Sequence, residues 1–155
     1  MRDLEFEVST QWDGDVSTRH GVLEAGGGQI EYSAPSTMGG SGEGTNPEEL
    51  LLSAVATCYT LGLSRLLHKR DLPASSVRVS ARGVVSGYPL AATFARIVVS
   101  PAIAGADRSR AADYETAARV ARDRCFIGKT LAASVSYEVG QVTFTSELTA
   151  DAVQR

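Results

Sequence analysis

One long apolar segment, residues 46 to 73, constrains the fold more than any other part of the chain. Asn46 can cap a helix, Pro47 suits the first helical position, and Glu49 stands three residues after the cap, as in a capping box. Pro73 ends the pattern. Apolar side chains cover most of the predicted helix: Leu50, Leu51, Leu52, Ala54, Val55, Cys58, Tyr59, Leu61, Leu63, Leu66 and Leu67. A helix that is apolar on most sides must be buried on most sides, so we expect it at the centre of the fold.

Strand patterns lie on both sides of this helix. Alternation of apolar and polar residues predicts strands around residues 4–8, 22–24, 29–33, 77–81, 93–100 and 135–139, the last of which can continue to residue 144. Helical spacing predicts further helices over 108–124 and 128–133. Because the strands arrive in runs, we expect an α+β fold with mostly antiparallel sheets. The length of 155 residues suits a single domain, 1–155, with a core of about 4–145 and a frayed tail after Glu147.

Composition excludes several classes of partner. The net charge is −3, and the only basic cluster is residues 68–70, so we expect no nucleic-acid binding. No uninterrupted apolar run approaches the length that a membrane span needs, and the N-terminus has no apolar signal segment. We therefore expect a cytoplasmic protein. Two cysteines in that compartment are redox-active or simply buried, rather than a permanent staple.

Nucleotide and metal sites are poorly supported. The glycine-rich loop 39–44 precedes a helix, but no Lys-Ser/Thr pair follows it, and Glu48 and Glu49 place negative charge where a phosphate would bind. Two histidines and two cysteines without C-x-x-C or H-x-x-H spacing make a weak zinc site. The sequence contains no G-x-S-x-G motif, so it does not support a serine hydrolase of that type.

The two cysteines are more informative. Cys58 lies within the long helix, and Cys125 ends the apolar stripe of the second one, after Arg119, Arg122 and Arg124. Taken alone, each cysteine is typical of a small buried hydrophobe. Both helices must pack on one sheet in a domain of this size, so the two thiols could meet and cycle between dithiol and disulfide.

The segment 44–50, followed by Cys58 ten residues after Glu48, resembles the osmotically inducible and organic hydroperoxide resistance (OsmC/Ohr-like) family of peroxidases. The segment 122–129 around Cys125, the sequence 12–15 and the glycine loop support the resemblance, which covers roughly residues 8–144. It implies a thiol peroxidase that reduces organic hydroperoxides. Cys58 would be the peroxidatic cysteine, which becomes a sulfenic acid, and Cys125 the resolving one, which condenses with it to a disulfide. An external dithiol, such as a lipoyl or thioredoxin-like protein, would restore the pair without a bound cofactor.

The family also implies an arginine–glutamate pair at the site, in which the guanidinium favours the reactive thiolate. Glu48 matches the glutamate. The osmotically inducible branch carries its arginine ten residues earlier, where this chain has Met38. The hydroperoxide-resistance branch carries it in a turn near the N-terminus, so Arg19 is our candidate. The family's proline after the second cysteine is Phe126 here.

Helix geometry constrains how the predicted site can be assembled. Ten residues of helix separate Glu48 from Cys58 by about 15 Å, so the two side chains cannot touch within one straight helix. Either another element bridges them or Glu48 comes from a second chain, and the resemblance implies an intertwined homodimer with two interfacial pockets. A pocket lined by Leu51, Val55, Tyr59 and Phe126 would favour alkyl hydroperoxides. The rival interpretations are a redox-inactive dimer of the same fold that binds an apolar ligand, and a general thiol–disulfide oxidoreductase, which the absence of C-x-x-C disfavours.

Overall fold

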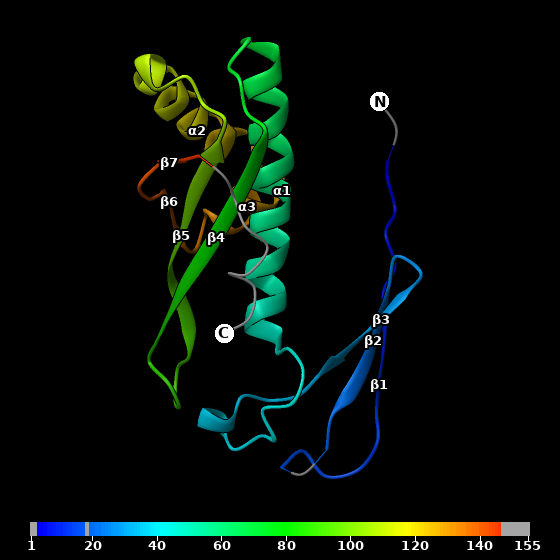
Figure 1. The fold of residues 1–155 in the computed structure, drawn as a ribbon. Helices are drawn as coiled ribbons and strands as arrows, with labels where there is room; N and C mark the ends of the chain where they lie inside the picture. The colour runs from blue at the N-terminus through cyan, green and yellow to red at the C-terminus, as the bar shows by residue number, and fades with distance from the viewer. Residues whose placement is uncertain (1–2, 18, 147–155) are drawn as a thin grey trace. The chain divides into compact units, whose positions relative to one another are not determined.

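The computed structural model describes residues 3–17 and 19–146, and the chain divides into two compact units, Met1–Leu51 and Leu52–Arg155 (Figure 1). The tail predicted to fray after Glu147 lies outside the described residues. That the whole chain behaves as a single domain stays a prediction. The two units are described in turn.

The first unit contains a three-stranded antiparallel sheet in the order β1-β2-β3. Its strands are β1 (Ser9–Trp12), β2 (Gly21–Ala25) and β3 (Gly28–Tyr32), and a short 3-10 turn, η1 (Ser36–Met38), follows. Gly26 and Gly27 join β2 to β3 with φ of 58° and 78°. Positive φ at both positions is what a tight two-residue hairpin of the I′ type requires, and glycine adopts it without strain.

The prediction of a strand over residues 4–8 is wrong for the single chain. The structure begins β1 at Ser9, and Leu4, Phe6 and Val8 are 64%, 87% and 64% exposed. The alternating pattern is present, but no described strand of the chain pairs with this segment. Without a partner for its backbone, the pattern cannot form a sheet.

The long helix, α1 (Pro47–Lys69), begins and ends where the sequence predicts. Asn46 caps it, because its Oδ1 accepts a hydrogen bond of 2.8 Å from the Glu49 backbone N–H. The Glu49 carboxylate accepts from the Thr45 hydroxyl at 3.0 Å. The predicted capping box is therefore only half formed, since Glu49 bonds a side chain and not the cap's own N–H.

One side of α1 packs into the second unit, with Val55, Tyr59, Leu63, Leu66 and Leu67 buried, while Leu61 on another side is 62% exposed. By length and composition alone α1 could also cross a membrane, with a mean hydropathy of 1.5. The core helices of soluble proteins meet the same criteria, and five side chains of α1 are buried in the core of this unit.

The sheet of the second unit is mixed. Strands β4 (Ser76–Ser86) and β5 (Thr93–Ala104) form the predicted antiparallel hairpin, whose turn contains residues 87–89. The two C-terminal strands, β6 (Ser136–Val139) and β7 (Thr143–Thr145), both pair with β5 in parallel. The helices are α2 (Ala111–Arg124), entered through the 3-10 turn η2 (Arg108–Arg110), and α3 (Phe126–Leu131).

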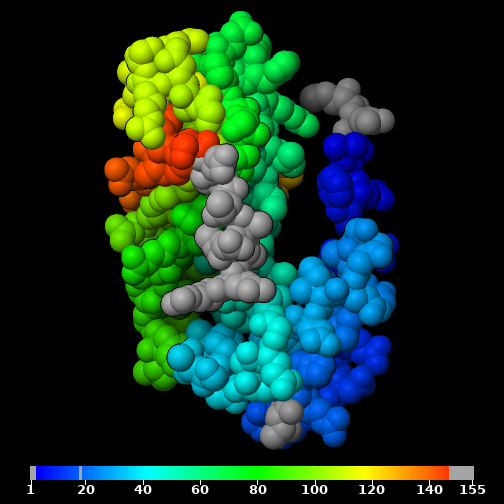
Figure 2. All heavy atoms as spheres, viewed as in Figure 1, coloured from blue at the N-terminus to red at the C-terminus, as the bar shows by residue number. Residues whose placement is uncertain are grey.

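The core of the second unit lies between α1, α2 and this sheet. Its fully buried side chains come from all three: Val55, Tyr59 and Leu63 from α1, Ile97, Val99 and Ile103 from β5, and Tyr114, Ala117 and Ala121 from α2. On the face seen in Figure 2, the orange-red spheres of the β7 region lie next to the yellow spheres of the η2–α2 region, in agreement with the ring contact of Tyr114 with Phe144. Small alanines on α2 allow this helix to approach the core closely.

Candidate functional site

The structure brings Cys58 and Cys125 together inside the second unit. Cys58 lies on α1 and is half-buried, whereas Cys125 lies between α2 and α3 and is 2% exposed. Both are free thiols, Cys58 packs against the buried cluster to which Cys125 belongs, and the Cys58 side chain raises the pKa of Cys125. The two thiols therefore share one core, as a dithiol that cycles to a disulfide requires.

The backbone around Cys125 fixes the position of its sulfur. Cys125 ends α2, with its N–H donating to the Ala121 carbonyl at 2.9 Å, and it also caps α3, because its Sγ accepts from the Gly128 N–H at 3.4 Å. Phe126 occupies the first position of α3, where a proline is readily accommodated. Phe126 stands at this position instead, so α3 begins here without a proline, and the phenylalanine is 65% exposed.

Two tyrosines flank the thiols. The Tyr59 hydroxyl donates to the Ala118 carbonyl at 3.1 Å. The Tyr137 hydroxyl, on β6, is buried and has no well-formed hydrogen bond with any described residue, and it lies within reach of the Cys125 thiol. The ring of Tyr137 packs so tightly on Gly128 that a Cβ there would stand 2.1 Å from Cε1. Sequence reasoning missed Tyr137, because only its inward position on β6 distinguishes it.

Burial is the main cause of the pKa shifts of Cys125, Tyr59 and Tyr137. It raises the pKa of the Cys125 thiol; the Gly128 N–H opposes this effect and the Cys58 side chain adds to it. Burial also raises the pKa of both Tyr59 and Tyr137 well above the ordinary value. Cys125 is thus a protonated thiol at neutral pH, and the two phenols are hydrogen-bond donors rather than anions.

A cation lies close to this cluster. Arg122 stands one helical turn before Cys125, donates from Nη1 to the Tyr137 carbonyl at 3.1 Å, and pairs through Nε with Asp123 Oδ1 at 2.7 Å. Its charge also acts on Tyr59, whose pKa it lowers against the larger effect of burial. The sequence contains the signal for Arg122, which is the three-residue spacing to Cys125 on one helix face.

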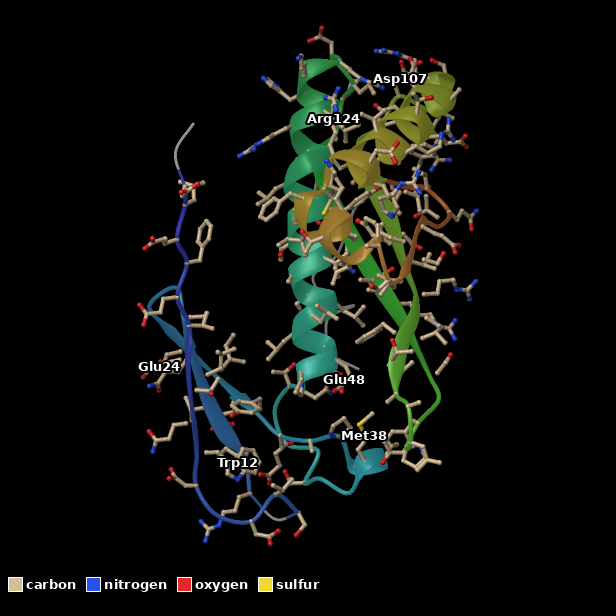
Figure 3. The ribbon with its side chains drawn as sticks, turned by 180° about the vertical axis from the view of Figure 1, so that it is seen from behind. Trp12, Glu24, Met38, Glu48, Asp107 and Arg124 are labelled. Carbon is tan, nitrogen blue, oxygen red and sulfur yellow. The ribbon has the colours of Figure 1, made fainter. Side chains whose placement is uncertain are left out.

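Glu48 lies in the first turn of α1 and lines a small apolar cavity of about 260 Å³ in the first unit (Figure 3). Its Oε2 is buried and has no hydrogen-bond partner among the described residues. Met38, ten residues before Glu48, lines the same cavity. A buried carboxylate oxygen without a partner is costly, so this cavity is short of one donor.

Arg19 lies elsewhere in the first unit. It is exposed in the loop before β2, its N–H donates to the Asp15 carbonyl at 3.1 Å, and its side chain packs on Gly14. It lines a separate polar hollow of about 540 Å³ with His20. In the described chain no ion pair joins Arg19 to Glu48, so their predicted pairing stays a prediction. Within the described ranges, no group of three or more His, Cys, Asp or Glu residues is suited to a metal ion.

Comparisons with known proteins agree with this architecture. The sequence model of the family described as OsmC-like protein matches residues 40–140. YmaD, an uncharacterized protein of Bacillus subtilis (strain 168), is 28% identical over 142 residues, which are 90% of this chain and 94% of YmaD.

Solved structures share the fold at low sequence identity. An OsmC-like protein of unknown function from Vibrio cholerae is 18% identical with a TM-score of 0.75, over 90% of this chain and 99% of that one. An organic hydroperoxide resistance protein, OsmC, from Legionella pneumophila is 18% identical with a TM-score of 0.69, over 91% and 99% of the two chains. Since the family model spans more than half of the sequence, this chain belongs to the OsmC-like family.

Proposed function

We propose that the protein is a thiol peroxidase that reduces organic hydroperoxides to alcohols. The observation that carries this proposal is the pair of free thiols in one core, one partly accessible and the other buried and protonated. A peroxidatic cysteine must be reached by the peroxide, and a resolving cysteine must wait beside it. Cys58 suits the first role and Cys125 the second.

The cycle balances with two reactants from solution. The Cys58 thiolate attacks the O–O bond of the hydroperoxide, becomes a sulfenic acid, and releases the alcohol after protonation. The Cys125 thiol then condenses with the sulfenic acid, which forms the disulfide and releases water. A dithiol reductant, such as a lipoyl or thioredoxin-like protein, supplies two electrons and two protons to restore both thiols.

The surroundings favour an apolar substrate. Leu61 lies one turn from Cys58 on α1 and is 62% exposed, and Phe126 follows Cys125 and is 65% exposed. Of the predicted pocket residues, Val55 and Tyr59 are wrong, because both are fully buried in the core. An alkyl chain covered by Leu61 and Phe126 would be removed from water, which a hydrogen peroxide molecule cannot exploit.

We infer that the working form is a cytoplasmic homodimer. Glu48 and Cys58 lie ten residues apart on α1, so about 15 Å of helix separates them. A second copy can bring a Glu48 cavity to each dithiol, and Arg19 or another guanidinium can supply the donor that the buried Glu48 oxygen lacks. The guanidinium would favour the Cys58 thiolate and hold the departing oxygen.

Thiol counting tests the function directly. Reduced protein is treated with one equivalent of cumene hydroperoxide, and its free thiols are counted by alkylation and intact mass. We expect both thiols to disappear together, and Cys58→Ser to abolish turnover with dithiothreitol. Cys125→Ser should instead give a sulfenic acid that dimedone traps. If both thiols remain reduced, the chain is a redox-inactive relative, and binding of an apolar ligand becomes the better account.

A further inference from the structure

The hydroxyl of Tyr137 makes no well-formed hydrogen bond among the described residues that would explain why this position is a tyrosine. Its ring is 7% exposed and packs on Gly128, and its backbone carbonyl is held by Arg122 at 3.1 Å. The hydroxyl is buried without a well-formed hydrogen bond to any described residue. A phenylalanine would fill the same space and avoid the cost of a buried, poorly satisfied hydroxyl. The neighbouring Tyr59 differs, because its hydroxyl has the Ala118 carbonyl as a partner.

The atom that the Tyr137 hydroxyl can serve is the Cys125 sulfur. Both groups stand against Gly128: a Cβ built there would lie 2.8 Å from Cζ of Tyr137, and the Gly128 N–H donates to the Cys125 sulfur. The phenol also lowers the pKa of the thiol, and the sulfur raises the pKa of the phenol, as expected when the phenol donates and the sulfur accepts. The interaction stabilises the sulfur as an anion and keeps the phenol protonated. The Gly128 N–H also points at this sulfur, at 3.4 Å. Two donors therefore converge on a sulfur that is a neutral thiol in the resting protein.

We propose that Tyr137 is a catalytic hydrogen-bond donor that stabilises the Cys125 sulfur as it leaves the Cys58–Cys125 disulfide. This inference rests on the proposed redox cycle and assigns the side from which the reductant attacks. Cys125 is 2% exposed and Cys58 half-buried, so an incoming thiolate reaches the Cys58 sulfur. The new bond joins the reductant to Cys58, and the bond between the two cysteines breaks.

In that step Cys125 carries the electron pair and becomes a thiolate inside the core. The Tyr137 O–H and the Gly128 N–H then hydrogen-bond an anion rather than a neutral sulfur, and such bonds are about twice as strong. A proton released by the dithiol neutralises Cys125. The second thiol of the reductant attacks the mixed disulfide and releases Cys58 with the oxidised reductant.

The test isolates disulfide reduction from peroxide chemistry. The disulfide is made in the full chain with diamide, which needs no hydroperoxide, and is then reduced by excess dithiothreitol, with samples quenched in acid and alkylated. Loss of a hydrogen bond to a charged group should slow Tyr137→Phe about ten- to hundredfold. Tyr59→Phe is the matched control, because its hydroxyl bonds a carbonyl, and it should reduce at the wild-type rate. Equal rates for Tyr137→Phe and wild type would overturn the proposal, as would an equal slowing of Tyr59→Phe.

Two measurements guard against a misfolded variant. In wild type, excess 2-mercaptoethanol should be trapped as a mixed disulfide on Cys58, mapped by peptide mass; attachment to Cys125 overturns the proposal without any Tyr137 variant. In a Cys58→Ser background, Tyr137→Phe should raise the pKa of Cys125, measured by the pH dependence of alkylation, and an unchanged value counts against the donor role. If cumene hydroperoxide fails to oxidise the thiols but these results hold, the proposed substrate is wrong and the role of Tyr137 stands.

Discussion

At the scale of single residues, Gly128 determines how closely the Tyr137 ring can approach the dithiol. An added Cβ would lie 2.1 Å from Cε1 and 2.8 Å from Cζ of that ring, far inside van der Waals contact. The strand that carries the ring is fixed by its pairing with β5, in which Tyr137 stands opposite Ile97. The absence of a side chain at this position is therefore part of the site.

We predict that Gly128→Ala destabilises the protein by about 1–3 kcal/mol, the usual cost of overpacking a core. Urea unfolding of the reduced protein measures the change. Gly62→Ala is the matched control: it also lies in a helix, but a Cβ there meets no atom within 4 Å. That variant should gain about 0.5–1 kcal/mol from helix propensity. Equal stability changes in the two variants would contradict the role of the Tyr137 ring.

The sequence predicted the roles of single residues correctly where the pattern lay within one helix. The cap at Asn46 follows from the residue types at the helix start, and the inward register of Cys58 and Cys125 follows from helical periodicity. Tyr137 could not be found in this way, because its role depends on a contact between β6 and α3. The partner of Glu48 could not be found either, since a charge pair leaves no periodic pattern.

At the scale of elements, the start of α1 depends on one side chain. Asn46 Oδ1 satisfies the Glu49 N–H, one of the unpaired donors of the first turn. We predict that Asn46→Ala lowers the free energy of unfolding by about 0.5–2 kcal/mol, measured by urea denaturation. Asn46→Ser keeps an oxygen at the cap and should recover most of the loss. If serine and alanine are equally destabilising, the cap is not the cause.

Three titratable groups in the core between α1, α2 and β6 should make the protein less stable at alkaline pH. The pKa of Cys125, Tyr59 and Tyr137 is raised in the folded protein, from ordinary values of 9.0 for cysteine and 10.0 for tyrosine. Above these values the unfolded chain loses protons that the folded chain retains, so stability falls as pH rises. Below about pH 9 these groups are protonated in both states, and their contribution is fully present.

We predict that urea unfolding of the reduced protein shows this loss between about pH 9 and about pH 11, with a slope of about 1.4 kcal/mol per pH unit for each group. Tyr59→Phe removes one group and should make the slope shallower, even though the variant is less stable at neutral pH. A stability that stays constant to about pH 11 would show that these side chains are exposed to solvent.

Elements with local signals were predicted well, and pairings between distant strands were not. The cap, the apolar spacing and Pro73 all lie within or beside α1, and the β4–β5 hairpin has its turn between its strands. The parallel pairing of β6 and β7 with β5 has no local signature, because it depends on the path of α2 and α3 between them. The segment 4–8 has a strand pattern but lacks a partner in its own chain.

At the scale of the whole molecule, the segment 4–8 and the exposed side of α1 both favour association with a second copy of the chain. Leu4, Phe6 and Val8 alternate with Glu5 and Glu7, and the apolar members are all well exposed. Such a segment can add to the edge of a sheet in a second copy, which would satisfy its backbone and bury its apolar face. A homodimer would also account for Leu61 on the open side of α1.

We predict that light scattering at micromolar concentration gives twice the chain mass of 16.3 kDa. Because a two-fold interface contains each side chain twice, and a buried phenylalanine contributes about 1.5–3 kcal/mol, Phe6→Ser should weaken the dimer about a hundredfold or more. Glu7→Ser is the matched control from the opposite face of the same segment and should dimerise as wild type does. A monomeric wild-type protein would remove the second copy that the peroxidase proposal requires to bring Glu48 to Cys58. Dimers equally stable in both variants would instead place the interface elsewhere, with the exposed side of α1 around Leu61 as the next surface to test.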